Sequence, residues 1–252
     1  MAEKFYITTP IYYVNDKPHI GHAYTTILAD VLARYHKTEG EDVFFLTGLD
    51  EHGQKVQQAA EERGVSPKDH CDEMALRFLE LWEKLHIEND DFIRTTEDRH
   101  VKVVQDIIQT VYDNSDIYED VYEGLYSVSE ERFITEKEAE SGEFRDIKKL
   151  QEKNYFFKMS KYQQALIDHI NDNPNFIQPE HRKNEILGFL RKPLGDLCIS
   201  RPKSRLNWGI DLPFDNNFVT YVWFDALINY VTATGFGVDD ESYQKWWPAE
   251  YH

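Results

Sequence analysis

Two histidines one helical turn apart, His19 and His22, flank Gly21 in a segment that follows Pro18. Imidazoles at a helix start can donate hydrogen bonds to phosphate oxygens, because the orphan N–H groups and the helix dipole already favour anions there. Gly21 lacks a Cβ, so a ligand can approach the backbone closely. A histidine pair of this kind is also compatible with a metal site or with solvent exposure. The proline turn and the helical pattern that follows favour a phosphate site in an enzyme.

A second polar group, residues 47–53, follows directly after a short apolar run. Asp50 within it has two interpretations. It can cap the next helix, which is the commoner role of an aspartate in such a loop, or it can pair with an ammonium group on a substrate. Both interpretations place Asp50 near the histidine turn, because ligands bind where the carboxyl ends of parallel strands meet.

An apolar stripe begins at Trp223 and continues through Ala226, Leu227 and Tyr230, which fall on one side of a predicted helix. Such a stripe is usually part of a hydrophobic core. This one starts at the end of a predicted strand, where the wall of a pocket is expected. It therefore also fits an aromatic site for an apolar side chain.

The elements that must position these residues alternate between strand and helix. Apolar spacing predicts strands over residues 5–14, 42–46 and 92–94. It predicts helices over residues 23–35, 54–63 and 101–112, and a further helix towards His86 with Ser66 as N-cap and Pro67 in its first turn. The alternation predicts an α/β fold with a doubly wound, parallel, Rossmann-like nucleotide-binding sheet.

The middle of the chain has a different texture, with short aromatic segments that are typical of antiparallel strands. We expect strands around residues 117–126, 133–135 and 155–157, a solvated connection over 136–143, and helices over 163–170 and 185–190. This region is predicted to be an inserted α+β module. A strand over 219–223 and a helix over 224–234 then resume the first pattern. The predicted domains are 1–115, 116–215 for the insertion, and 216–252.

The composition excludes several classes of protein. The 252 residues carry 46 acidic and 28 basic side chains, a net charge of −18, which argues against a nonspecific polyanion binder. Cys71 and Cys198 lie far apart, so the sequence supports neither a disulfide framework nor a thiolate zinc site. We expect a cytoplasmic protein with no membrane contact, because no long apolar run is present.

Three segments closely resemble the methionyl-tRNA synthetases of class I in their residues, order and spacing. They are residues 10–22, 47–53 and 221–226. The resemblance covers essentially the whole chain, and the inserted module corresponds to the connective peptide domain of that family. The first segment alone would indicate only the wider class I group. Together the three segments are highly specific.

The resemblance implies a role for each matching residue. His19 and His22 would bind ATP and stabilise the transition state, with Gly21 against the nucleotide, and Asp50 would hold the amino group of methionine. Arg201 would lie near the active site. The methionine side chain would be surrounded by residues that favour a soft thioether, namely Ile11, Tyr13, Trp223, Ala226 and Tyr230.

The implied reaction has two steps. Methionine and ATP, with Mg²⁺, would form methionyl-adenylate and pyrophosphate, and the methionyl group would then pass to the 3′ end of tRNA(Met). The sequence does not indicate the oligomeric state. Many family members bind structural zinc through cysteines, but the first two of those positions hold Ser127 and Glu130 here, so no zinc is expected.

Residues 158–161, Lys-Met-Ser-Lys, look like the second signature of class I, a mobile lysine loop that binds the triphosphate. We interpret them as a decoy, because they follow a strand inside the inserted module. The family places its lysine loop beyond residue 252. We therefore expect a fragment without the lysine loop or the anticodon-binding domain, and impaired in methionine activation.

Three alternatives stay open at this stage. Another class I synthetase, for leucine, valine or cysteine, would share the histidine turn but not the aromatic pocket. A small nucleotidyltransferase would not need the insertion. A non-catalytic nucleotide-binding protein would keep the fold without the activity. A preference for methionine over leucine, valine and cysteine would separate these possibilities.

Overall fold

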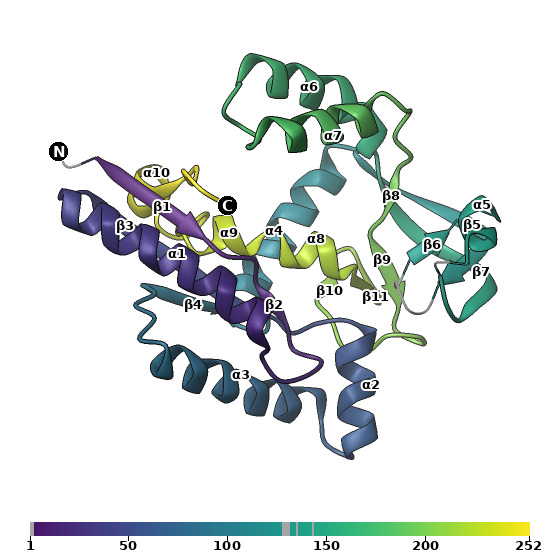
Figure 1. The fold of residues 1–252 in the computed structure, drawn as a ribbon. Coiled ribbons are helices and arrows are strands. Elements are labelled where there is room, and N and C mark those ends of the chain that lie inside the picture. Colours follow the sequence, from purple (N-terminus) through teal and green to yellow (C-terminus); the bar gives the residue numbers. More distant parts are fainter. Residues whose placement is uncertain (1–2, 128–131, 135, 143) are drawn as a thin grey trace. The chain divides into compact units, whose positions relative to one another are not determined.

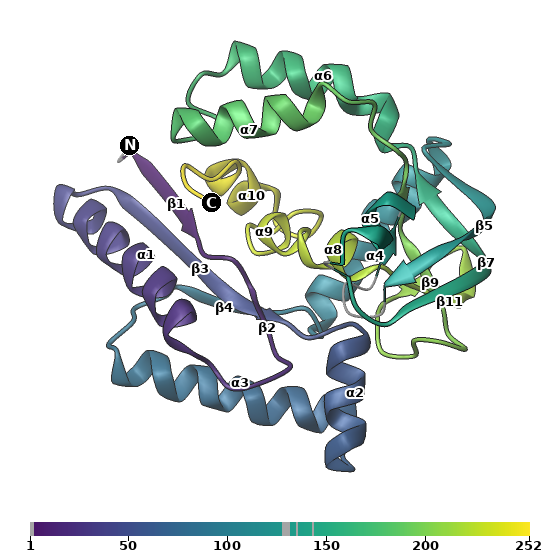
Figure 2. The ribbon, with the colours of Figure 1, turned by 45° about the vertical axis from the view of Figure 1, so that its right-hand side comes forward.

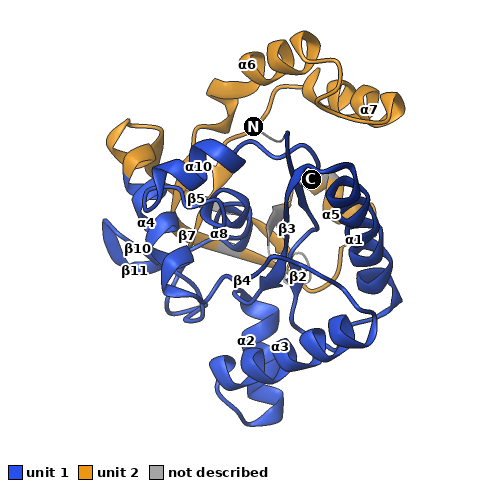
Figure 3. Ribbon diagram, turned by 90° about the vertical axis from the view of Figure 1, so that its left-hand side faces the viewer, with its two compact units in different colours: residues 1–109, 201–252 blue, residues 110–200 orange. Residues whose placement is uncertain are grey.

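The computed structural model describes residues 3–127, 132–134, 136–142 and 144–252. The chain forms two compact units, the first made of residues 1–109 and 201–252 and the second of residues 110–200 (Figure 3). These units have different bounds from the three predicted domains, 1–115, 116–215 and 216–252, which stay a prediction.

The first unit is built on a parallel sheet around strand β3 (Asp42–Asp50). Strands β1 (Lys4–Thr8) and β2 (Tyr12–Tyr13) pair with successive parts of β3, and β4 (Asp91–Arg94) pairs with it as well (Figure 1). The strand predicted over 5–14 is therefore two strands. Pro10 lies between them and cannot donate a ladder hydrogen bond. β3 also runs past its predicted end at residue 46.

Helices cover both faces of this sheet, which confirms the predicted doubly wound arrangement (Figure 2). Side chains alternate between the two faces along β1, so Phe5 and Ile7 point to one face and Tyr6 points to the other. Phe5 and Ile7 pack against helix α1 (Ile20–Glu39). Tyr6 packs against residues in and around α9 (Asn229–Thr232) and α10 (Asp240–Trp246).

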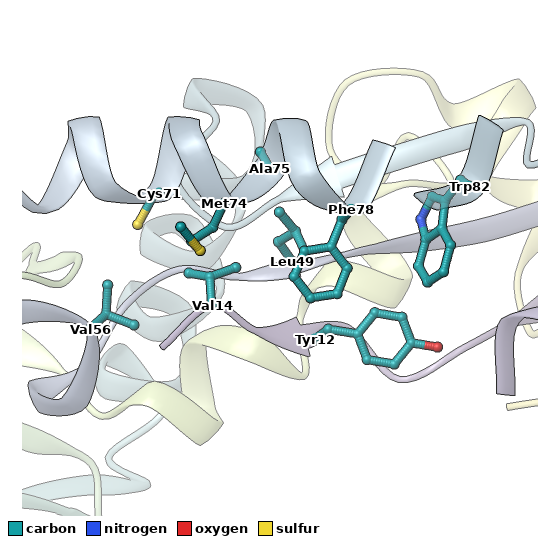
Figure 4. Packing of buried hydrophobic residues seen from close by; sticks show 9 residues of the cluster. All are labelled: Tyr12, Val14, Leu49, Val56, Cys71, Met74, Ala75, Phe78 and Trp82. Atoms are coloured by element: carbon teal, nitrogen blue, oxygen red, sulfur yellow. The ribbon is translucent and has the colours of Figure 1, made fainter. Parts of the chain in front are cut away.

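The carboxyl ends of β2 and β3 rest on a buried cluster shown in Figure 4. Helix α3 (Pro67–Lys84) contributes much of it and begins as predicted, with the Ser66 side chain accepting a hydrogen bond from the backbone N–H of Asp69. Burying a large apolar side chain stabilises a fold by about 1.5–3 kcal/mol, so this cluster anchors the strand ends firmly. Its members are Tyr12, Val14, Leu49, Val56, Cys71, Met74, Ala75, Phe78 and Trp82.

The remaining elements of the first part of the chain follow the predicted order. Helix α2 (Gln54–Arg63) has its predicted bounds, and α4 (Asp98–Asp113) extends the helix predicted over 101–112. A small three-stranded sheet is formed by β9 (Ser200–Pro202), β10 (Asp211–Leu212) and β11 (Asp215–Thr220).

The second unit contains an antiparallel sheet in the order β6, β5, β7, β8 and two helices, α6 (Met159–Asp172) and α7 (Glu180–Leu190). The strand β5 (Ile117–Ser127) is one long strand rather than several short ones, because it pairs continuously with β7 (Ile147–Phe157). A short helix, α5 (Glu136–Glu140), occupies part of the predicted connection. The other strands are β6 (Arg132–Ile134) and β8 (Leu197–Cys198). Glu130 lies outside the described residues.

The lysine-loop decoy lies at the start of α6 in this second unit. The Lys158 ammonium donates to the carbonyl oxygen of Ser115 at 2.8 Å, and the Lys161 ammonium pairs with Asp116 at 2.6 Å. Both cations therefore connect the start of α6 to the residues just before β5, within the second unit.

Candidate active site

His19 and His22 form the first turn of α1, which begins three residues before its predicted start. His19 is the N-cap residue, and its Nδ1 accepts a hydrogen bond from the backbone N–H of Gly21 at 3.0 Å. The Nδ1 of His22 accepts one from the backbone N–H of His19 at 3.2 Å. This is the reciprocal pattern of a capping box, made here by two imidazoles. The helical periodicity of apolar residues could not reveal this first turn.

The capping contacts determine where each neutral ring carries its proton. Because Nδ1 accepts a hydrogen bond in both rings, the proton of the neutral form is on Nε2. The rings of His19 and His22 stack with centroids 3.8 Å apart. Burial, together with repulsion from His19, lowers the pKa of His22 to about 4. At neutral pH the His22 ring is therefore uncharged and has an Nε2–H to donate.

Gly21 serves this arrangement through its lack of a side chain. A Cβ at position 21 would lie 2.9 Å from Cε1 of His19 and 3.1 Å from its Nδ1. The imidazole of His19 therefore occupies the space that an alanine methyl group would need. The close approach of a ligand to Gly21 stays a prediction, and the group that lies nearest to this position in the structure is the His19 ring.

Asp50 is the last residue of β3 and lies opposite Tyr13 in the parallel register with β2. It is buried, with 8% of its surface exposed. The N-cap of α2 is Gly53, which makes no side-chain cap. The helix-cap interpretation of Asp50 is therefore wrong, because β3 continues through residues 47–50. Asp50 instead presents a carboxylate at the carboxyl end of the sheet.

Ile11 and Tyr230 lie together in the first unit. Both pack against the buried cluster that contains Tyr6, and the Tyr6 hydroxyl donates to the Tyr230 carbonyl oxygen at 2.8 Å. Burial raises the pKa of Tyr230, and the negative charge of Asp50 acts in the same direction. Tyr230 is therefore a neutral phenol near the Asp50 carboxylate.

The predicted helix over 224–234 is two short helices, α8 (Val222–Ala226) and α9 (Asn229–Thr232). Ala226 is 3% exposed, whereas Trp223 is 58% exposed. The structure thus brings Ile11, Tyr13, Asp50 and Tyr230 to one end of the sheet. It places Trp223 on the surface of α8 rather than in the buried part of this group.

Asp225 was not singled out by the sequence, yet it joins two histidines in the interior. Its Oδ2 accepts a hydrogen bond from His52 Nδ1 at 2.7 Å, and its Oδ1 accepts one from His100 Nε2 at 2.8 Å. Burial alone would raise the pKa of Asp225, but His52 and His100 outweigh burial and hold it below the usual range. His52 and Asp225 lie inside the quoted segments, while nothing local marks His100.

Glu51, between Asp50 and His52, is also fully buried. It accepts hydrogen bonds from Arg94 Nε at 2.6 Å and from the Thr96 hydroxyl, and its carbonyl accepts one from the Trp208 indole. Arg94 also contacts Asp72 at 2.6 Å. Hydrogen bonds therefore hold the loop that follows β3 at two consecutive residues, Glu51 and His52.

Arg201 is 4% exposed, and its guanidinium lies over the Tyr221 ring, 4.4 Å from the ring centroid. This contact fixes Arg201 against the residue that precedes α8. Cation–π contacts of this kind are worth more when they are removed from water.

Among the described residues, no group of three or more His, Cys, Asp or Glu side chains is arranged to hold a metal ion. Cys71 and Cys198, which both lie in the described part of the chain, form no disulfide. No helix in the described part of the chain is long and apolar enough to cross a membrane.

The chain is similar to known proteins in sequence and in fold. The chain is 52% identical to the methionine–tRNA ligase of Clostridium acetobutylicum over 99% of its length and 39% of the relative's, and 49% identical to that of Thermotoga maritima, over 99% and 40%. It is similar to the Mycobacterium tuberculosis methionyl-tRNA synthetase in complex with methionyl-adenylate, with a TM-score of 0.92 and 40% identity, covering 99% of this chain and 50% of that one.

The chain thus spans about 40% of the length of the curated relatives that it matches. The family described as tRNA synthetases class I (M) matches residues 5–143 and 142–252. These segments take in the histidine turn, the loop after β3 and helix α8. The chain belongs to this family of class I tRNA synthetases.

Proposed function

We propose that this chain is the N-terminal part of the catalytic region of a methionine–tRNA ligase. That enzyme activates methionine with ATP and transfers it to tRNA(Met). The observation that carries the proposal is the buried Asp50 carboxylate at the carboxyl end of β3, in register with Tyr13. The names of the relatives and the adenylate bound to the similar structure support it.

Methionine is proposed to bind at the end of β2 and β3. The Asp50 carboxylate pairs with the substrate ammonium group, which offsets the cost of burying either charge alone. The thioether side chain lies against rings and aliphatic groups, since sulfur makes favourable contacts with aromatic edges. We assign this wall to Ile11, Tyr13, Ala226 and Tyr230, with the exposed Trp223 ring at its rim.

ATP is proposed to bind at the start of α1. His19 and His22 each present an Nε2–H to phosphate oxygens, beside the positive end of the α1 dipole. A methionine carboxylate oxygen bonds to the α-phosphorus while the bond to the pyrophosphate oxygen breaks. Hydrogen-bond donors already in place stabilise the negative charge that develops on the phosphate.

Magnesium is proposed to arrive with ATP, where it would neutralise phosphate charge. The residues described in the structure supply no carboxylate cluster for it. The proposed domains are 1–115 and 216–252 for the nucleotide fold and 116–215 for a zinc-free connective peptide domain. Transfer to tRNA(Met) is a proposal for the whole protein of which this chain forms part.

The test is titration calorimetry of the 252-residue chain with methionine, leucine, valine and cysteine. Methionine is expected to bind most tightly. Binding of a non-hydrolysable sulfamate analogue of methionyl-adenylate tests the methionine and phosphate sites together. Equal affinity for all four amino acids would contradict the assignment. A preference for leucine or valine would favour another class I synthetase.

A further inference from the structure

We propose that Asp225 is a positioning residue that holds the two parts of the methionine site together. It would fix the loop that follows Asp50 against the helix bearing Trp223 and Ala226. The proposal rests on the proposed function, because it concerns the geometry of that same site.

The Asp225 carboxylate is fully buried, and both of its oxygens are used. Oδ2 binds the loop after β3 through His52, and Oδ1 binds α4 through His100. The Nδ1 of His100 lies 3.3 Å from the Thr232 hydroxyl on α9. One carboxylate on α8 is thereby connected to the loop, to α4 and, through His100, to α9.

The neighbours of this carboxylate in sequence explain why its position matters. Asp50 and His52 are two residues apart, and Trp223 and Ala226 flank Asp225 on α8. The loop is rigid at this point, because the Trp208 ring packs edge-on to His52 with centroids 5.5 Å apart. A shift of α8 relative to His52 would therefore change the spacing between Asp50 and the side-chain wall.

The two histidines use different ring nitrogens, which makes the contact testable. The amide nitrogen of Asn can replace Nδ1 of a histidine, and that of Gln can replace Nε2. His52→Asn and His100→Gln therefore keep a donor to Asp225, whereas His52→Gln and His100→Asn misplace it. Asn and Gln are thus each introduced at both positions, and each keeps the donor at one position and misplaces it at the other.

The experiment measures methionine affinity and ATP affinity of the 252-residue chain and these four variants. Charge-assisted hydrogen bonds are strong, so we expect methionine affinity to fall by about tenfold in His52→Gln and His100→Asn. It should stay near wild type in His52→Asn and His100→Gln. ATP affinity should not change, because His19 and His22 lie in a different helix.

Asp225→Asn is the companion variant and should also weaken methionine binding while leaving ATP binding unchanged. If that variant does not fold, the two His52 variants still decide the matter, because the His52 side chain is 7% exposed whereas that of His100 is fully buried. Unchanged methionine affinity in the misplaced variants would overturn the proposal. So would equal losses in matched and misplaced variants, or a parallel loss of ATP affinity, since these indicate a general effect on stability. A wild-type chain that shows no preference for methionine would contradict the proposed function instead.

Discussion

The backbone N–H of His19 donates to Nδ1 of His22, and so the two histidines cap the helix that they begin. Capping uses one side of each ring, and the proposed phosphate binding would use the other. The Nδ1 side is occupied by the backbone, and the Nε2 side is left to meet a ligand. Substitutions that keep one side and remove the other can therefore separate helix stability from ligand binding.

Replacing His22 tests this separation. In His22→Glu the side chain can still reach the N-cap backbone, as in an ordinary capping box, but it has no N–H to donate to a phosphate. We expect its free energy of unfolding to stay near wild type and its affinity for the adenylate analogue to fall about tenfold. His22→Ala should lose the same affinity and also about 1 kcal/mol of stability. Denaturant unfolding and calorimetry measure the two effects, with Leu28→Ala on the exposed side of α1 as control. Equal stability of the Glu and Ala variants would contradict the capping role.

Gly21→Ala should lower the affinity for ATP without destabilising the helix. Alanine favours a helix over glycine by up to about 1 kcal/mol. The added methyl group, however, would lie 2.9 Å from His19 Cε1 and push that ring out of place. We expect a helix that is no less stable and a weaker affinity for ATP. An unchanged ATP affinity would show that the position of the His19 ring does not matter for binding.

The low pKa of His22 predicts a pH dependence of stability. Its pKa is about 4 in the folded chain and 6.5 as an ordinary histidine, so the unfolded state binds more protons between these values. His22 therefore destabilises the fold as the pH falls through this window, and stability rises with pH across it. Denaturant unfolding at several pH values should show a smaller slope for His22→Gln than for the wild type. Identical slopes would contradict the assignment.

Arg94 should be essential for the stability of the loop after β3. Removing it in Arg94→Ala leaves the Glu51 carboxylate, which is 0% exposed, without its cation. Breaking a buried pair in this way costs about 3–5 kcal/mol. Lys68→Ala breaks an exposed pair with Asp72 and should cost about 0.5 kcal/mol or less. Unfolding free energies of the two variants provide the comparison, and similar values would argue against a structural role for Glu51.

Lys161→Ala should leave ATP and methionine affinity unchanged. The Lys161 ammonium is paired with Asp116 inside the second unit, and the neighbouring Tyr162 hydroxyl contacts the same carboxylate. Loss of the pair should lower thermal stability. A fall in ATP affinity with unchanged stability would instead restore residues 158–161 as a triphosphate loop.

Local signals in the sequence predicted the sheet and most helices. Ser66 and Pro67 fixed the start of α3, because a cap and a first-turn proline are local features. The start of α1 was missed because its cap is a histidine, which propensity arguments do not expect there. The role of Asp50 could not be decided, because it depends on how far β3 continues.

The contact between His100 and Asp225 could not be predicted at all. These residues are 125 positions apart, and a histidine in an amphipathic helix has no local mark of its partner. The sequence predicted that Trp223 and Tyr230 line the same pocket wall. Only the folded chain shows that Trp223 is exposed and that Tyr230 is partly buried. Interactions that depend on tertiary packing thus set the limit of what a single sequence reveals.

The same long separations bear on the order in which the molecule assembles. His52 and Asp225 are 173 positions apart, so their hydrogen bond closes a large loop and belongs among the late events of folding. During synthesis Asp50 emerges from the ribosome long before Asp225 does. The nascent chain therefore contains His19, His22 and Asp50 well before helix α8 has been synthesised. We therefore expect the proposed methionine site to be complete only after the Asp225 carboxylate has met His52 and His100.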